Sequence, residues 1–217
     1  MLYLVSTPIG NLKDISSRTL DTFKEVDLIL AEDTRRTGML LKHCLIQKKM
    51  SSYNDTNKER ITSKIIEDLK SGLNIALVSD NGTPCISDPG FYLVREAIKN
   101  NLHISPIPGP TAFVSALICS GLPTDKFSFS GFLPKKEGKK TEIFNNLNDG
   151  TNIFYESPHR IIKTLKLLSE IHPDINIVIA RELTKKFEDF IRGKARELYL
   201  DLKDKTLKGE IVLLLYK

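Results

Sequence analysis

The chain has 217 residues, of which 41% are hydrophobic and 27% are charged, and its formal net charge is +5 at pH 7. This is the composition of an ordinary soluble globular protein, and the longest apolar runs, such as Ile211 to Tyr216, are far too short to form a transmembrane helix. The positive charge is compatible with a polyanionic partner such as RNA, because basic side chains that meet phosphates release counterions, but alone it is weak support for one.

The N-terminus and the cysteines indicate the compartment and bear on metal binding. The chain runs directly into the strand-like segment Leu2 to Val5, without the basic and long apolar stretches of a secretory signal, so we expect a cytoplasmic protein. Cys44, Cys85 and Cys119 are widely separated and form no C-x-x-C pair. They predict buried or incidental thiols and no metal site.

Up to about residue 110, short β-branched or leucine-rich segments alternate with amphipathic ones, which is the pattern of a parallel sheet covered by helices. A helix is indicated where isoleucines and leucines recur at helical spacing from Ile61 to Leu69, and Gly72 suits its left-handed cap. Asp88 followed by Pro89 predicts the N-cap and first position of the next helix. The expected strands are Leu2 to Ser6, Leu28 to Ala31, Asn74 to Ser79 and Leu102 to Ile107.

After a helix of small residues, Thr111 to Ser120, the alternation resumes, so we predict two α/β domains, 1–118 and 119–217. A helix is indicated from Ile161 to Leu168, while Lys185 to Gly193 fits either a helix or a hairpin, and Lys135 to Lys140 reads as a charged, solvated loop. The expected strands are Phe127 to Phe132, Asn152 to Glu156, Ile175 to Ala180 and Glu210 to Tyr216.

Three loops that follow strands of the first half could bind a ligand. Thr7 to Asn11 is neither G-x-G-x-x-G nor a P-loop, which disfavours an ordinary dehydrogenase or NTPase. Ser79 to Pro84 and Pro106 to Thr111 combine glycine, which allows close backbone approach, with proline, which makes a loop rigid before binding. We expect these two loops to lie side by side and form a crevice.

Charged clusters also follow strands. Glu32 to Arg36 is either a self-neutralising ion-pair turn or a source of arginines for RNA phosphates and of a carboxylate for a hydroxyl proton, and the residues do not choose between these. Tyr155 to Arg160 and Ala180 to Lys186 are either solvated strand ends or a rim that faces the substrate.

Taken in order, these motifs resemble one family, the ribosomal RNA small-subunit methyltransferase I group of the tetrapyrrole methylases, from Leu2 to about Tyr216. Asn81 departs from the small alanine usual in that family, and Cys85 from a small or aliphatic residue. The motifs are Ser6 to Leu12, Ala31 to Arg35, Ser79 to Pro84, Ser87 to Gly90, Pro106 to Pro110, Phe154 to Arg160 and Ala180 to Lys186.

The resemblance implies a two-domain tetrapyrrole-methylase-like fold, with a mostly parallel N-terminal sheet, a mixed C-terminal sheet and a cofactor cleft between them. It implies S-adenosylmethionine as cofactor, a homodimer without membrane association, and methylation of the 2′-oxygen of a decoding-centre cytidine in 16S ribosomal RNA or the small subunit. Carried onto this sequence, the cofactor-binding residues are Pro8, Ser79, Asp80, Asn81, Gly82, Thr83, Pro84, Ser87, Pro108, Thr111, Ala112, Tyr155, Leu183, Gly209 and Glu210.

A ribose hydroxyl is a poor nucleophile, so methyl transfer to it calls for a group that manages one proton. The candidate catalytic residues are Asp33, Glu156, Glu182 and Lys185, and the candidate RNA-binding residues are Arg35, Arg36, Lys135, Lys136 and Arg160. Two other functions stay open: a methyltransferase of the same fold that acts on a tetrapyrrole or on a diphthine-type protein side chain, and a non-catalytic ribosome-assembly factor that has lost the cofactor.

Overall fold

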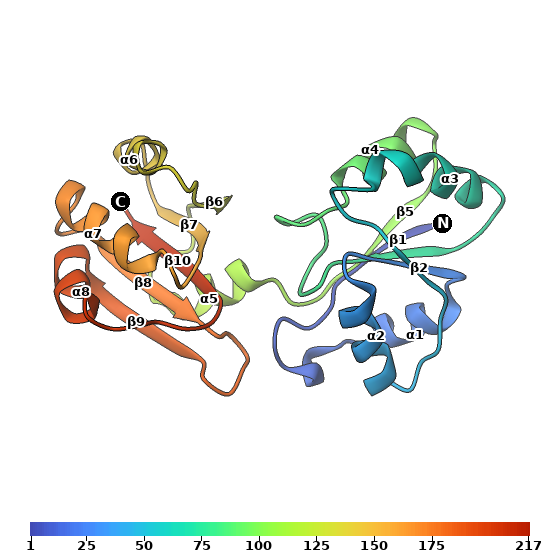
Figure 1. Ribbon diagram of the computed structural model, residues 1–217, viewed down its shortest axis with the longest axis horizontal. Helices are drawn as coiled ribbons and strands as arrows, with labels where there is room; N and C mark the ends of the chain where they lie inside the picture. The colour runs from blue at the N-terminus through green and yellow to red at the C-terminus, as the bar shows by residue number, and fades with distance from the viewer. The chain divides into compact units, whose positions relative to one another are not determined.

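The computed structural model describes residues 1–217 and divides into two compact units, Met1–Thr111 and Ala112–Lys217 (Figure 1). The predicted domain boundary at 118/119 falls inside helix α5 (Ala112–Ser120). The division precedes this helix because α5 packs on three strands of the second unit. No helix in the structure is long and apolar enough to cross a membrane.

The first unit is a parallel five-stranded sheet in the order β3-β2-β4-β1-β5, with helices on both faces. Leucine and isoleucine side chains of α3 and α4 cover one face, and those of α1 and α2 the other. The elements are β1 (Leu2–Val5), the 3₁₀ helix η1 (Leu12–Asp14), α1 (Ser17–Glu25), β2 (Leu28–Ala31), α2 (Thr34–His43), β3 (Met50–Ser52), α3 (Lys58–Lys70), β4 (Ile75–Val78), α4 (Phe91–Lys99) and β5 (Ile104–Ile107).

Of the two helix boundaries read from the sequence, one is confirmed and one is wrong. Gly72 has φ +98° just past the end of α3, and its amide donates to the Leu69 carbonyl, as a left-handed cap does. The predicted N-cap Asp88 is wrong, because Gly90 caps α4 with φ +143°. A side chain at Gly90 would overlap Cys85 and Leu77, so the chain turns here through glycine.

The second unit holds the mixed sheet β6-β7-β10-β8-β9, in which β6 and β7 are parallel and the other pairs antiparallel. Its main core lies between this sheet and helices α6, α7 and α8, while α5 packs against β10, β7 and β8. The elements after α5 are β6 (Phe127–Phe132), α6 (Glu137–Asn145), β7 (Thr151–Glu156), α7 (Ile161–Ile171), β8 (Asn176–Arg181), β9 (Asp189–Lys194), α8 (Ala195–Leu202) and β10 (Ile211–Tyr216).

Two segments that were ambiguous or unexpected in the sequence become clear in the second unit. The stretch Lys185 to Gly193 is a hairpin, because β9 pairs antiparallel with β8. The expected charged loop Lys135 to Lys140 is wrong in its second half, where α6 begins at Glu137. Its Lys140 is buried because Glu156 and Thr164 bind its ammonium group.

Candidate functional site

The loops after β1, β4 and β5 meet at the carboxyl edge of the first sheet. The Thr7 amide donates to the Gly82 carbonyl at 2.8 Å, and the Gly82 amide donates back to the Thr7 carbonyl at 3.1 Å. These two bonds pair the loop after β1 with the loop after β4. β1 lies between β4 and β5 in the sheet, so the two loops expected to lie side by side follow strands that are not direct neighbours. The loops nevertheless contact one another across the end of β1.

Thr83 is the point where the three loops are joined. Its hydroxyl donates to the Pro110 carbonyl at 3.1 Å and lies 3.0 Å from the Ser6 hydroxyl and 2.8 Å from the Thr111 hydroxyl. The Thr83 side chain thus contacts Ser6, 77 positions before it in the sequence, and Thr111, 28 positions after it. Such a network orders the loops before any ligand arrives, which lowers the entropic cost of binding.

Two glycines allow this close approach. Gly82 has φ +81°, and a Cβ on it would lie 3.0 Å from the Ile9 side chain. A Cβ on Gly109 would lie 2.8 Å from the Cβ of Ser6, which is buried and cannot move aside. The predicted cofactor residues Pro8, Gly82 and Pro84 are buried in these loops, while Asn81 and Pro108 are exposed.

We predict that Gly109→Ala weakens binding of S-adenosylmethionine about tenfold or more, because the new methyl group must push the loop after β5 away from Ser6. Calorimetric titration measures the change. Gly138→Ala is the matched control: Gly138 lies on α6 with open space around it, and alanine there should leave binding unchanged and favour the helix. Equal affinities for both variants would contradict the role of the joined loops.

The continuation of the loop after β4 holds strained backbone and a perturbed carboxyl group. Cys85 and Ser87 adopt positive φ values of 69° and 64°, which non-glycine residues rarely do. Burial and the nearby charge of Glu32 raise the pKa of Asp88 to about 7, although Ser79 donates a hydrogen bond to it. Burial and Asp88 also raise the pKa of the Cys85 thiol to about 11, so it is a poor nucleophile.

The Asp88 carboxyl makes stability depend on pH in a defined direction. Its folded pKa of about 7 exceeds the ordinary aspartate value, so the folded chain keeps a proton that the unfolded chain loses above about pH 4. The resulting stability is full below pH 4 and is lost as the pH rises through 7. We expect the free energy of unfolding in urea to fall less between pH 4 and pH 8 for Asp88→Asn than for the unchanged protein. Parallel curves for the two proteins would contradict this.

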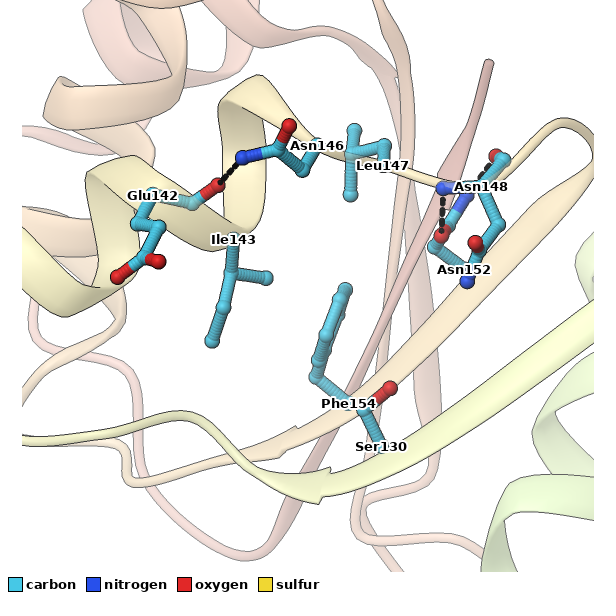
Figure 2. A pocket seen from close by; sticks show the side chains of 8 residues that line it. All are labelled: Ser130, Glu142, Ile143, Asn146, Leu147, Asn148, Asn152 and Phe154. Carbon is cyan, nitrogen blue, oxygen red and sulfur yellow. Dashed lines mark hydrogen bonds between the residues drawn. The ribbon is translucent and has the colours of Figure 1, made fainter.

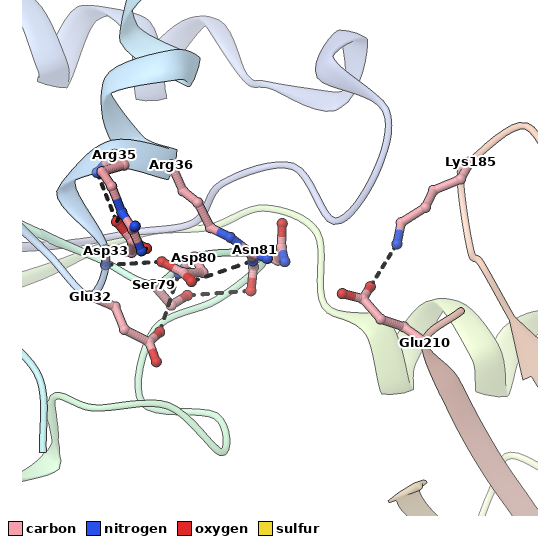
Figure 3. A network of polar contacts seen from close by, with 9 residues as sticks. All are labelled: Glu32, Asp33, Arg35, Arg36, Ser79, Asp80, Asn81, Lys185 and Glu210. Carbon is pink, nitrogen blue, oxygen red and sulfur yellow. Dashed lines mark hydrogen bonds and ion pairs between the residues drawn. The ribbon is translucent and has the colours of Figure 1, made fainter. Parts of the chain in front are cut away.

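Ion pairs tie the end of β2 to the end of β4 (Figure 3). Asp33 caps α2 and pairs with Arg35 at 2.6 Å, and the Arg35 hydrogen bonds lower the Asp33 pKa to about 2. Asp80 accepts from the Asp33 amide at 3.0 Å and pairs with Arg36 at 3.4 Å. The structure thus shows the ion pairs expected if Glu32 to Arg36 forms a self-neutralising turn. Contact of Arg35 and Arg36 with RNA stays a prediction.

In the second unit, several of the predicted site residues lie where strands β7 and β8 end and β10 begins. The start of β10 pairs with the ends of both β7 and β8, since Ile211 is opposite Glu156 and Arg181. This register brings Tyr155, at the end of β7, to the same edge as Leu183 and Gly209. Ala112 is the first residue of α5.

Lys185, Glu182 and Glu210 form a compact charged group at these strand ends. Figure 3 shows its Lys185–Glu210 pair. The Lys185 ammonium donates to Glu182 at 3.0 Å and to Glu210 at 2.9 Å. The hydrogen bond from the Glu210 amide and the one from Lys185 lower the Glu182 pKa. Burial lowers the pKa of Lys185, but the carboxylates of Glu210 and Glu182 outweigh it and raise the pKa. Lys185 therefore stays protonated and positively charged.

The backbone around this group is sharply turned. Glu182 has φ +50° and Thr184 has φ +63°. Gly209, with φ +90°, lies against the Glu182 side chain, and a Cβ there would overlap the carboxyl group. Such conformations persist only where the surroundings enforce them, so the position of Glu182 is fixed.

Glu156 lies in a buried polar network and not at the surface of the site. Its carboxylate is fully buried and accepts from Lys140 at 2.7 Å, Arg160 at 2.6 Å and Thr164 at 2.7 Å. Arg160 also donates to the Leu133 carbonyl at 3.2 Å. The network therefore connects the ends of β6 and β7 to helices α6 and α7.

Of the three predicted RNA-binding residues in the second unit, two are exposed and unpaired. Lys135 and Lys136 are exposed and make no ion pair, whereas the Arg160 guanidinium is engaged with Glu156 and is 24% exposed. All three lie at the carboxyl ends of β6 and β7.

A pocket of about 440 Å³ opens elsewhere in the second unit, between α6 and strands β6 and β7 (Figure 2). Its asparagine side chains are committed to the chain itself: Asn152 donates to the Asn148 carbonyl at 2.8 Å, and Asn146 to the Glu142 carbonyl at 2.8 Å. None of the predicted site residues lines it. No group of three or more His, Cys, Asp or Glu side chains is placed to hold a metal ion.

Sequence reasoning missed two features of this site. Asp88 was assigned to a helix cap, and only the fold reveals that its carboxyl group is partly buried near Glu32 and Ser79. Glu210 was assigned to the cofactor, and its ion pair with Lys185 depends on strand pairing over 25 positions. No local sequence signal reports either contact.

Comparison with known proteins places these features in a family. The model of the Tetrapyrrole (Corrin/Porphyrin) Methylases matches residues 1–199. The chain is 48% identical over 215 residues to Ribosomal RNA small subunit methyltransferase I of Halalkalibacterium halodurans, covering 98% of this chain and 74% of that protein. It is 47% identical to the protein of the same name from Hydrogenobaculum sp., covering 100% and 95%.

A solved structure has the same fold. It is uroporphyrin-III C-methyl transferase from Thermus thermophilus complexed with S-adenyl homocysteine, with a TM-score of 0.66, 16% identity, and coverage of 98% of this chain and 96% of that chain. The predicted two-unit architecture, with a parallel first sheet and a mixed second sheet, is confirmed.

Proposed function

Because the chain belongs to the tetrapyrrole methylase family, and within it to the ribosomal RNA small subunit methyltransferase I group, we propose that it transfers a methyl group from S-adenosylmethionine to small-subunit ribosomal RNA. The acceptor we propose is the 2′-oxygen of a decoding-centre cytidine in 16S RNA. We further propose that the protein acts in the cytoplasm as a homodimer.

The observation that carries this proposal is the joining of three rigid loops by Thr83 at the carboxyl edge of the parallel sheet. Ligands of open α/β sheets bind outside the carboxyl ends of the strands. The chemistry of the residues there fits a cationic nucleoside, since Glu32, Asp80 and Asp88 supply carboxyl groups for hydroxyl and ammonium groups. The cofactor residues named from the sequence remain our proposal for the binding site.

When bound, S-adenosylmethionine supplies an electrophilic methyl group, and the chain must align the ribose oxygen with it and handle one proton. Of the candidate carboxylates, Glu156 is enclosed by its partners, and both carboxylate oxygens of Asp33 accept hydrogen bonds from Arg35. We therefore assign the proton step to the Glu182 and Lys185 pair. The ionised Glu182 carboxylate accepts the hydroxyl proton and holds the lysine at 3.0 Å. The Lys185 ammonium group stabilises the negative charge that develops on the ribose oxygen while that oxygen bonds to the methyl carbon and the carbon–sulfur bond breaks.

A salt titration separates RNA from a small tetrapyrrole or a protein side chain as the substrate. RNA binding should weaken by roughly 0.7 log units per log unit of salt for each phosphate contacted by a single strand. An affinity that is independent of salt would favour the other substrates. Calorimetry separates the enzyme from a non-catalytic assembly factor, because such a factor would release no heat with S-adenosylmethionine.

A further inference from the structure

A row of aromatic side chains lies on one face of the second sheet, at its β6 edge. The ring of Phe129 is 4.9 Å from that of Tyr155, and Phe132 is 5.3 Å from the same tyrosine, both edge to face. Phe113 of α5 stacks on Phe129 at 4.3 Å and lies 6.5 Å from Phe127. We call Phe127, Phe129, Phe132 and Tyr155 the aromatic row.

A β-bulge builds this row. Phe129 is opposite Ile153 and Phe132 is opposite Tyr155, so three steps along β6 match two along β7. Without the irregularity, Phe132 would point to the opposite face from Phe127 and Phe129, because side chains alternate along a strand. Gly131, with φ +66°, provides the turn that the extra residue needs. The backbone thus places all three phenylalanines on one face.

The aromatic row is partly exposed and does not belong to the main core of the second unit. Phe127 is 47% and Phe132 is 62% exposed. The core of this unit lies on the other face, where Phe144 of α6 packs edge to face with Phe154 of β7. β6 is also an edge strand of its sheet. Large aromatic groups left in solvent on a sheet edge indicate a surface that contacts something else.

The charge around the row selects the kind of partner. Three lysines, Lys126, Lys135 and Lys136, and two acidic residues, Asp125 and Glu137, flank the strand of the row, so the stretch 125–137 has a net positive charge. Lys126 immediately precedes the row, and Lys135 and Lys136 follow it; all three are exposed and make no ion pair. Cations at both ends of a line of aromatic rings match a chain with a phosphate backbone and planar bases, as in sheet-based RNA-binding modules, where aromatic rings stack two or three bases.

We propose that the aromatic row stacks two or three unpaired bases of the RNA substrate, while Lys126, Lys135 and Lys136 bind its phosphates. The inference rests on the proposed function and adds to it a base-binding surface and a preference for single-stranded RNA. Tyr155 belongs both to this row and to the proposed cofactor residues.

The test compares two fluorescent RNA oligonucleotides of equal length and charge, one with bases and one abasic. Phe132→Ala and Phe127→Ala should each weaken binding of the oligonucleotide with bases roughly 5- to 150-fold, the range for loss of one base stack, and leave the abasic one unchanged. Phe132→Leu, which keeps an apolar side chain, should show the same loss. Phe91→Ala is the matched control, because Phe91 is 69% exposed on α4 and remote in sequence from the row.

Two results would overturn the inference. One is equal loss for both oligonucleotides, or no loss for either. The other is a shift to a smaller species in sedimentation of Phe132→Ala, with RNA binding restored at high protein concentration, since the row would then join two copies of the chain. The proposed function is tested separately. If the wild-type protein binds RNA through its bases but transfers no methyl group, the base-binding role of the aromatic row is supported and the proposed methyltransferase activity is refuted.

Discussion

Replacing Lys185 by methionine is expected to lower kcat for RNA methylation about 100- to 1000-fold, the range for removing one preorganised group that stabilises developing charge. The lysine is held by Glu182 at 3.0 Å and Glu210 at 2.9 Å, and both carboxylates keep it charged. Methionine keeps the length of the side chain but not the charge. Because the interaction is made with the transition state, the affinity for S-adenosylmethionine should change little.

The neighbouring lysine is the matched control. Lys186 is exposed, makes no ion pair and lies 5.5 Å from the ring of Phe187. Lys186→Met removes the same charge one residue away and should retain nearly full kcat. Single-turnover rates at saturating cofactor measure the chemical step for both variants. Similar rates for Lys185→Met and the unchanged protein would remove Lys185 from the mechanism.

Glu156→Ala is expected to lower the free energy of unfolding by about 3–5 kcal/mol, which is the cost of removing one partner from a buried ion pair. Lys140 would lose its only carboxylate partner while its side chain remains 7% exposed. Arg160 would lose its contact at 2.6 Å, and with it the side-chain connection from Glu156 to the Leu133 carbonyl after β6. Urea unfolding, followed by circular dichroism, measures the loss.

Glu170→Ala is the control for this experiment. Glu170 also pairs with a lysine, Lys166, but at 3.9 Å with both side chains about 60% exposed. An exposed pair of this kind contributes at most about 1 kcal/mol. If the two variants unfold at the same urea concentration, the network around Glu156 is not what stabilises the second unit.

The sequence is sufficient to predict the fold class, because hydrophobic segments of the right length alternate with amphipathic ones and most of the expected strands end in a loop with a recognisable composition. The short strand β3 was not predicted. The glycine and proline loops were also visible in the sequence, because Gly82 and Gly109 stand where only a residue without a Cβ fits. Such backbone requirements act locally, so they are visible in the residues themselves.

Other features depend on contacts that no local pattern encodes. The charged stretch around Lys140 reads as solvated, and its burial follows only from Glu156 lying 16 positions further on. The order β4-β1-β5 places a strand between two strands whose loops nevertheless lie against each other, and the sequence does not indicate this intervening strand. The aromatic row requires a bulge at Gly131, and residue alternation alone assigns Phe132 to the opposite face.

The most direct test of the account is to incubate the purified protein with radiolabelled S-adenosylmethionine and small ribosomal subunits that lack this methylation, and then to hydrolyse the RNA in alkali. A methyl group on a ribose 2′-oxygen blocks cleavage at that nucleotide. We predict label in a single alkali-resistant dinucleotide that begins with cytidine, and its loss with Lys185→Met. Label on a base, or no label in the RNA, would contradict the proposed reaction.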